Sequence, residues 1–224
     1  MHFINIEGLD ASGKSTQIQQ LKQYFEENQI PYKYLHFPRT ESPVFGKLIA
    51  MFLRGELGAI NSVNPYLVAL IYAGDRNDAK NTIQKWMENN YLVLVDRYVY
   101  SNIAFQGAKL EDDKDIEDLS NWIKYLEYAY YQIPRPDLNL FLDVPADFTK
   151  SRLKAKREGV DRKYLQGKDD IHEKDLSFQQ NVRQIYLREI SKEEDFKLID
   201  CRDQSGEILD TTKIRDKILQ HLKL

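Results

Sequence analysis

The sequence predicts an α/β protein in which a five-stranded parallel sheet lies between two layers of helices. Two kinds of segment alternate along its 224 residues. Short apolar runs, rich in β-branched and aromatic residues, are separated by longer stretches with helical spacing, and this order indicates βαβ units with right-handed crossovers. The expected strands are residues 3–7, 33–37, 91–96, 138–144 and 196–200. The expected helices are residues 14–28, 65–89, 116–131, 146–157, 176–190 and 207–222.

Local chemistry marks several of these boundaries. Asn64 followed by Pro65 suits the N-cap and the first position of a helix. Pro134 and Pro136 should end the preceding helix before the fourth strand, because proline disrupts helical hydrogen bonding. The sequence contains neither an internal repeat nor a Ser/Gly linker, so we expect a single domain over residues 1–224.

Composition excludes several classes of protein. The formal net charge is -3 and the pI is about 5.9, so the whole chain has no electrostatic attraction to nucleic acid or anionic lipid. Its single cysteine, Cys201, fits a reducing compartment. No apolar run reaches the roughly 18 residues of a membrane helix, and the N-terminus lacks the pattern of a signal peptide. We expect a soluble, cytoplasmic protein that binds neither nucleic acid nor membrane.

Two charged segments stand out. Residues 111–118 are strongly acidic and are interpreted as a solvated loop and helix start. Residues 150–168 are strongly basic, for which a solvated helix is the simplest interpretation. Their position directly after the fourth expected strand favours a functional role instead.

Residues 8–15 form a phosphate-binding motif. They read Gly-Leu-Asp-Ala-Ser-Gly-Lys-Ser, the pattern G-x-x-x-x-G-K-[ST], between an expected strand and an expected helix. The glycines let backbone N–H groups point inward as an anion nest, and the helix dipole adds positive potential. Lys14 would hold the β- and γ-phosphates, and Ser15 would ligate Mg²⁺. The expected ATP-binding residues here are Gly8, Asp10, Ala11, Ser12, Gly13, Lys14, Ser15 and Thr16.

The motif predicts a P-loop NTPase fold but does not name the reaction. GTPases, motor ATPases and small-molecule kinases share it. The guanine-reading tetrapeptide N-K-x-D is absent from the sequence, which argues against a switch GTPase and leaves an ATPase or a kinase.

A second acidic strand end supports phosphoryl transfer. The apolar run 91–96 ends in Asp96, and ligands of parallel sheets bind outside the carboxyl ends of the strands. Asp96 would hold Mg²⁺ directly or through water, opposite Ser15. The alternative is an N-cap role, which aspartate also favours. Arg97 follows, and a metal-binding carboxylate beside a phosphate-binding guanidinium favours catalysis.

Residues 96–109 resemble the signature of thymidylate kinases, which runs D-R-Y, then S, then A-[FY]-x-G. They read Asp-Arg-Tyr-Val-Tyr-Ser-Asn-Ile-Ala-Phe-Gln-Gly-Ala-Lys. Residues 7–17 are similar to the P-loop of that family, including the acid two positions after the first glycine. Looser similarity covers residues 37–39, 72–76 and 141–145, and the whole resemblance runs from about residue 3 to 200.

The resemblance implies transfer of the γ-phosphoryl group of ATP to dTMP with Mg²⁺. Arg39 and Arg97 would bind the acceptor phosphate, and Arg97 and Lys14 would be catalytic. For the base, the resemblance implies that Tyr72 stacks on thymine, that Arg76 donates to a thymine carbonyl, and that Asn102 or Gln106 completes the base edge. For the sugar, it implies that Phe105 excludes a 2′-hydroxyl and that Asp10 binds the 3′-hydroxyl. It also implies that Arg152 contacts adenine and that Phe37 and Ser101 make further contacts with dTMP. Taken without the resemblance, Tyr72 and Phe105 fit a core, Arg39 fits a solvated loop, and Arg76 fits a pair with Asp75 or Asp78.

The resemblance also implies a lid. Some family members carry an arginine inside the P-loop, whereas residues 9–12 here contain none. Other members supply it from a lid, which would be residues 154–170 of this chain, with Gly159 and Gly167 as hinges. Arg157 or Arg162, helped by Lys156, would then be catalytic, and His172 is interpreted as a surface or lid residue.

Several alternatives remain open from the sequence. The family resemblance implies a homodimer through helices, for which the aromatic residues 122–131 offer an apolar surface or a piece of core. Another nucleoside or nucleotide kinase on the same fold is the nearest functional alternative. A nucleotide-binding regulatory module with slow hydrolysis is the more distant one.

Overall fold

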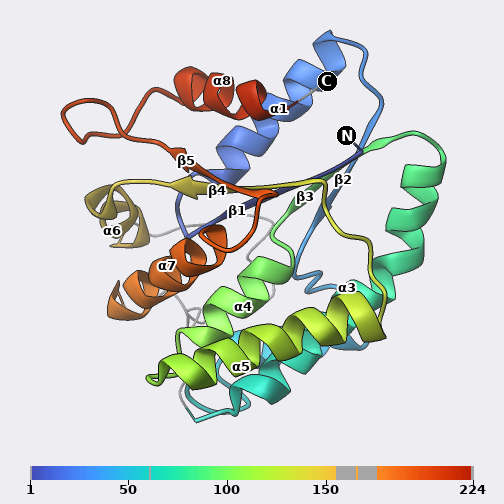
Figure 1. Ribbon diagram of the computed structural model, residues 1–224, viewed down its shortest axis with the longest axis vertical. Helices are drawn as coiled ribbons and strands as arrows, with labels where there is room; N and C mark the ends of the chain where they lie inside the picture. The colour runs from blue at the N-terminus through green and yellow to red at the C-terminus, as the bar shows by residue number, and fades with distance from the viewer. Residues whose placement is uncertain (1, 61, 155–164, 166–175, 223–224) are drawn as a thin grey trace.

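The computed structural model describes residues 2–60, 62–154, 165 and 176–222. Its centre is a five-stranded sheet with the order β2-β3-β1-β4-β5, in which all neighbouring strands are parallel (Figure 1). The strands are β1 (Phe3–Gly8), β2 (Tyr32–His36), β3 (Leu92–Asp96), β4 (Leu138–Asp143) and β5 (Phe196–Asp200). The predicted fold class is therefore confirmed.

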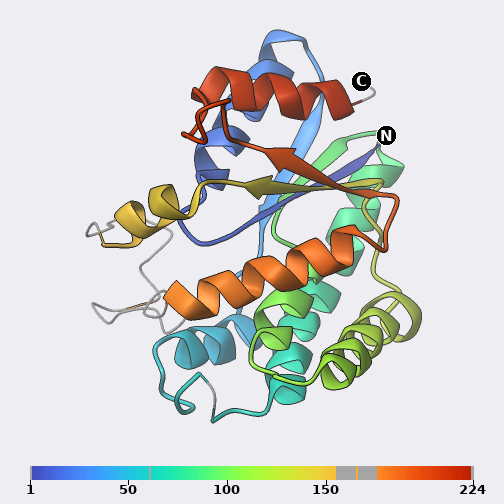
Figure 2. The ribbon, with the colours of Figure 1, turned by 60° about the vertical axis from the view of Figure 1, so that its left-hand side comes forward.

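Helices cover both faces of the sheet. They are α1 (Lys14–Glu27), α2 (Phe45–Leu53), α3 (Pro65–Glu88), α4 (Val99–Gly107), α5 (Asp113–Lys124), α6 (Ala146–Lys154), α7 (Leu176–Ile190) and α8 (Thr211–His221), and the π-helical turn η1 (Tyr125–Tyr130) continues α5. Helices α1 and α8 lie together on one face, and α4, α5 and α7 lie on the other (Figures 1 and 2). None of the described helices has both the length and the apolarity that crossing a membrane requires.

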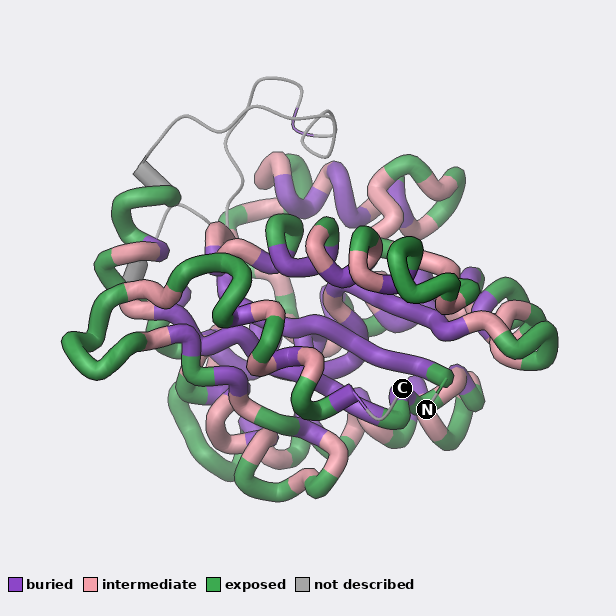
Figure 3. Tube along the Cα trace, turned by 90° about the horizontal axis from the view of Figure 1, so that it is seen from above, coloured by how far each residue is buried: buried purple, intermediate pink, exposed green. Residues whose placement is uncertain are grey.

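The two cores follow from alternation along the strands. On β1, Ile4 and Ile6 face α1 and α8, while Phe3 packs in the cluster with α3, α4 and α7. Every residue of β1, β3 and β4 is buried, as expected for central parallel strands (Figure 3). Covering both faces leaves the carboxyl edge of the sheet as the place where polar side chains gather.

Three sequence expectations differ from the structure. Helices α2 and α4 were not expected. The predicted helix 116–131 begins earlier, at Asp113, and ends in the π-helical turn η1. The predicted helix 207–222 begins only at Thr211, after Asp210 accepts a capping hydrogen bond from Thr212 N. The Asn64 cap is confirmed, since its side chain accepts from Tyr66 N.

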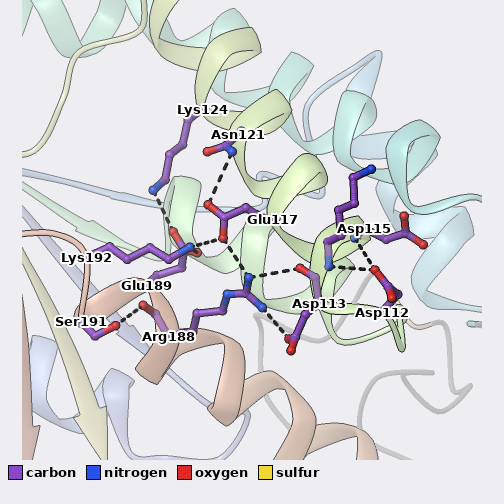
Figure 4. A network of polar contacts seen from close by, with 11 residues as sticks. Asp112, Asp113, Asp115, Glu117, Asn121, Lys124, Arg188, Glu189, Ser191 and Lys192 are labelled. Atoms are coloured by element: carbon purple, nitrogen blue, oxygen red, sulfur yellow. Dashed lines mark hydrogen bonds and ion pairs between the residues drawn. The ribbon is translucent and has the colours of Figure 1, made fainter.

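The acidic segment 111–118 forms the start of α5 and makes ion pairs with α7. Asp112 caps α5 through the N–H groups of Lys114 and Asp115, and Glu117 pairs with Arg188 on α7 and with Lys192 just after its end (Figure 4). The helix start is thus confirmed, while part of the acidic charge forms ion pairs between helices.

Candidate active site

The phosphate loop connects β1 to α1, as its motif predicts. Ala11 and Gly13 adopt positive φ angles of 61° and 87°, and α1 begins at Lys14 immediately afterwards. A Cβ on Gly8 would lie 2.6 Å from Ser12 Oγ, so any larger residue at this position would displace the Ser12 hydroxyl. Ser15 and Thr16 are exposed in the first turn of α1, where N–H groups lack helical partners and attract anions.

Lys14 is folded back onto the loop that it serves. Its side chain is buried, and Nζ donates to Gly8 O at 3.1 Å and to Leu9 O at 2.9 Å. Burial lowers the pKa of Lys14 to about 8, and the positive charge of Arg97 adds to this effect. An anionic phosphate would therefore gain a strong partner in this desolvated ammonium group.

Asp96 ends β3 beside the same loop. The carboxylate is 3% exposed, and His36 Nδ1 lies 3.2 Å from its Oδ2. Burial alone would raise its pKa, but the hydrogen bond and charge of His36, with Lys14 and Arg97, keep the pKa of Asp96 below its ordinary value. Its Oδ1 atom is buried and accepts no hydrogen bond from the described part of the chain. An ionised carboxylate with a free oxygen fits a Mg²⁺ site of the kind that combines few protein ligands with substrate phosphates.

Arg97 extends from a strained backbone toward the phosphate loop. Its φ angle is 66°, which is uncommon outside glycine, and its N–H donates to Ile6 O at 3.0 Å. Nη2 donates to Asp10 Oδ1 at 2.7 Å, and Nη1 donates to Ser101 Oγ at 3.2 Å. Burial would lower the pKa of Arg97, but the negative charge of Asp10 outweighs it, and the pKa is raised.

Three of the predicted acceptor residues, Asp10, Ser101 and Phe105, lie around Arg97. The structure brings together Arg97, Asp10 and Ser101, and the Arg97 guanidinium lies 5.0 Å from the ring of Phe105. Phe37 is fully buried against Tyr98, at a ring distance of 5.7 Å. Tyr72 is half-buried and packs against the apolar cluster of α2 and α3. Their roles in binding dTMP stay predictions.

Arg39 and Arg76 take carboxylate partners on different elements. Arg39 donates from N and Nε to Asp75 and from Nη2 to Asp78, the last at 2.6 Å. The alternative that Arg76 pairs with Asp75 or Asp78 is therefore wrong. Arg76 instead forms two hydrogen bonds with Glu127 on η1, because its side chain points into the helical layer between α3, α4 and η1.

Gln106 lies on the buried face of α4. It accepts a hydrogen bond from Lys109 Nζ at 2.6 Å. Burial lowers the pKa of Lys109 to about 7. Asn102, one turn earlier on the same helix, contacts Glu127 and Ala69. The role of Asn102 or Gln106 at the base edge stays a prediction.

Two site residues were missed by sequence reasoning. Glu7 is fully buried and accepts from Tyr98 N at 2.8 Å, Ser101 Oγ at 2.5 Å and Tyr186 OH at 2.8 Å, so it replaces the cap that α4 lacks. Gln179 on α7 donates to Asp10 Oδ2 at 2.8 Å and accepts from Asp10 N. An acid inside an apolar strand signals Glu7, but nothing in the sequence signals Gln179.

A cavity of about 300 Å³ opens beside the phosphate loop. It is lined by Ser12 and Gly13 of the loop, by Thr16 of α1, by Phe148 and Arg152 of α6, and by Leu209. The Arg152 guanidinium lies 4.7 Å from the Phe148 ring. The predicted adenine contact Arg152 therefore lies next to the phosphate loop, and the segment before α8, expected to be helical, forms part of the wall.

The predicted lid lies outside the described residues. This applies to most of residues 154–170, and to Lys156, Arg157, Arg162, Gly159, Gly167 and His172. Their catalytic and hinge roles stay predictions.

The fold and the site together define a P-loop kinase, with a triphosphate-binding loop and an arginine-rich acceptor region at one edge of a parallel sheet. The family model for thymidylate kinase matches residues 6–211, and the chain belongs to this family.

Similar proteins span nearly the same length. A probable thymidylate kinase of Pyrobaculum aerophilum is 32% identical over 210 residues, which cover 93% of this chain and 92% of that protein. The thymidylate kinase of Mycobacterium tuberculosis is 32% identical over 82% of this chain and 83% of its own. The solved structure of thymidylate kinase from Candida albicans matches with a TM-score of 0.69 and 27% identity, covering 98% of this chain and 89% of that one.

Proposed function

We propose that this protein is a dTMP kinase that transfers the γ-phosphoryl group of ATP to the phosphate of dTMP, giving ADP and dTDP. Within this site, the proposal is supported most directly by the hydrogen bond from Arg97 Nη2 to Asp10 Oδ1, at 2.7 Å. Asp10 belongs to the donor loop and Arg97 belongs to the acceptor region. A phosphate held by Arg97 would therefore lie next to the phosphates held by Lys14.

The residues divide the chemistry between them. An oxygen of the acceptor phosphate attacks the γ-phosphorus while the bond to the β–γ bridging oxygen breaks and ADP leaves. Arg97 and Arg39 would hold the acceptor phosphate in line, and Lys14 would stabilise charge on the transferred group. Ser15 and Asp96 would hold Mg²⁺, which neutralises phosphate charge when bound. Asp10 would take the 3′-hydroxyl, and Arg152 would lie on adenine.

The choice of dTMP as the acceptor can be tested by comparing nucleoside monophosphates. A coupled assay with dTMP, dUMP, dCMP, AMP and GMP should give the highest kcat/KM with dTMP, and ATP hydrolysis without an acceptor should be slow in comparison. A preference for a purine acceptor would overturn the base assignment. Nucleotide binding without any acceptor-dependent turnover would instead favour the regulatory module.

A further cation at the transferred phosphate would come from the expected lid. Because residues 9–12 contain no arginine, we propose that Arg157 or Arg162, helped by Lys156, closes over the phosphates. Alanine at the acting arginine should reduce kcat by about 10³-fold or more, as for arginine fingers. Arg215→Ala, on α8 and paired with Asp216, is the surface control. Full turnover in the Lys156, Arg157 and Arg162 variants would refute the lid role.

The homodimer and the cytoplasmic location also stay predictions. Support for a dimer comes from apolar side chains exposed on α3 and η1, where Leu67 is 59% and Tyr125 is 65% exposed. Exposed apolar patches often mark interfaces, and these side chains would contribute to one. The single buried cysteine fits a reducing compartment.

A further inference from the structure

Glu7 is a buried carboxylate to which the reaction scheme assigns no role. It lies near the end of β1 with no exposed surface. Its oxygens accept five hydrogen bonds, three at Oε1 and two at Oε2, from Asn5 Nδ2, Tyr98 N, Ser101 N, Ser101 Oγ and Tyr186 OH. All five donors are neutral groups. Packing of the strand does not require this arrangement, because an apolar side chain would fill the same place without the cost of burying a carboxylate.

The first oxygen, Oε1, holds the backbone that follows Arg97. It accepts from Tyr98 N at 2.8 Å and from Ser101 N at 3.2 Å. These are N–H groups of the N-cap and of the first turn of α4, which has no side-chain cap of its own. Arg97 has a φ angle of 66°, a strained conformation that persists only where its surroundings hold it. Glu7 therefore supplies one of the contacts that hold this conformation.

The second oxygen, Oε2, fixes the hydroxyl group of Ser101. Ser101 Oγ donates its hydrogen to Oε2 at 2.5 Å. A hydroxyl has one hydrogen and two lone pairs, so the lone pairs of Ser101 are left for other donors. Arg97 Nη1 donates to this oxygen at 3.2 Å, and a guanidinium can only donate. By taking the hydroxyl hydrogen, Glu7 determines that Ser101 is an acceptor toward Arg97.

The Arg97 guanidinium is thereby fixed at two nitrogens. Nη1 is held by Ser101, and Nη2 donates to Asp10 Oδ1 at 2.7 Å. A guanidinium fixed in this way presents its remaining N–H groups in one direction, as alignment of a reacting phosphate requires. We propose that Glu7 is a positioning residue for phosphoryl transfer, which holds Arg97 at the acceptor phosphate through Ser101. This inference deepens the proposed function and rests on it.

Exchanging the carboxylate for an amide separates the tasks of the two oxygens. In Glu7→Gln, the amide oxygen has to face the three N–H groups at Oε1, so the cap on α4 is kept. The new NH2 group then faces Ser101 Oγ and Tyr186 OH, which lie 2.8 Å apart. The lone pairs of Ser101 are taken by the amide and by Tyr186, at the expense of Arg97. The kcat/KM for dTMP should fall about 10- to 10²-fold, as for a misplaced catalytic group, while the ATP dissociation constant changes less than about threefold.

A double-mutant cycle tests whether the effect passes through Ser101. Ser101→Ala removes the link between Glu7 and Arg97 but keeps the backbone contacts of both. In this background we expect Glu7→Gln to lower kcat/KM for dTMP less than about threefold, because losses at one shared contact are not additive. Additive losses would show that Ser101 contacts dTMP directly or that Glu7 acts by another route, and would overturn the inference.

A matched control separates positioning from stability. Glu189→Gln makes the same exchange in another buried carboxylate, which is 1% exposed and pairs with Lys124 between α7 and α5. It should lower the Tm without affecting dTMP and ATP differently. If Glu7→Gln lowers the Tm and impairs both substrates equally, Glu7 supports the fold only, and the inference is overturned. A wild-type enzyme without turnover on dTMP would instead refute the proposed function.

A wild-type crystal structure with dTMP and ADP tests the same point if Glu7→Gln does not fold. The expected result is Arg97 on the acceptor phosphate, with Nη1 still on Ser101 Oγ and Ser101 still on Glu7. A Ser101 hydroxyl turned toward dTMP, or an Arg97 side chain that binds the phosphate without contacting Ser101, would overturn the inference.

Discussion

Replacing Lys14 by methionine should reduce turnover by several orders of magnitude while making the nucleotide-free protein more stable. The loss of turnover follows because the ammonium group is the charge that the phosphate loop brings to the transferred phosphoryl group, in a site shielded from water. Steady-state kinetics at saturating ATP and dTMP measure it. Turnover within tenfold of the wild type would contradict the role of Lys14.

The gain in stability follows from the pKa of Lys14. Folding lowers this pKa from 10.5 to about 8, so at neutral pH the folded state carries a desolvated charge. The shift corresponds to a cost of up to about 3 kcal/mol. Methionine also loses the hydrogen bonds to Gly8 O and Leu9 O, each contributing about 1 kcal/mol. The net gain is about 1 kcal/mol, or a rise in Tm of a few degrees.

The sign of the pH dependence provides an independent check. Below pH 8 lysine is protonated in both states, and the full cost is present. Between pH 8 and 10.5 the unfolded state binds more protons than the folded one, so wild-type stability rises with pH relative to the variant. Thermal melts without nucleotide should show a Tm difference that is largest at pH 7 and narrows toward pH 10. A variant that is less stable than the wild type at pH 7 would contradict this account.

Replacing Arg97 by alanine should impair use of dTMP far more than binding of ATP. The guanidinium is held by Asp10 and Ser101 and is a largely buried cation of the acceptor region, with its side chain 11% exposed. Losing a charge that is preorganised for the transition state lowers kcat by about 10²- to 10³-fold. We expect a loss of at least about 10²-fold in kcat and in kcat/KM for dTMP, with the ATP dissociation constant changed only a few-fold.

An arginine outside the site serves as the control for Arg97. Arg188→Ala removes ion pairs with Asp113 and Glu117 at the surface between α5 and α7, and should leave both substrate constants unchanged (Figure 4). Isothermal titration for ATP and steady-state kinetics for dTMP measure the two effects. Equal losses for both substrates in Arg97→Ala would show that Arg97 supports the fold rather than the acceptor.

The sheet could be predicted from the sequence because its strands are short apolar runs with sharp ends. Strand β5 was expected with its observed bounds, and strands β1 to β4 with bounds within one residue of those observed. Helix α4 could not be found in the same way. All nine of its residues are buried, so it lacks the polar face whose spacing reveals a helix. Recognition of a helix by amphipathic pattern fails where helices pack on every side.

The parts of the site that could be predicted are likewise those whose residues are close together in the sequence. The phosphate loop could be predicted because its residues are contiguous and the strand–loop–helix context is local. The partners of Arg39 and Arg76 could not, because Asp75 lies 36 residues from Arg39 and Glu127 lies 51 residues from Arg76. Those separations are bridged only by helix packing, which depends on the whole chain. Glu7 carried a sequence signal, an acid within a buried strand, but its acceptor geometry comes from α4 and α7.

The contacts of β1 with the residues just before α4 position the acceptor arginine relative to the phosphate loop. Ile6 O receives the Arg97 N–H, Glu7 receives the Tyr98 N–H, and the glycine turn begins at Gly8. Three consecutive residues thus anchor both the donor and the acceptor ends of the transfer path. These hydrogen bonds join β1 to the residues directly after β3, so a shift in the register of β1 against β3 would misalign both substrates at once.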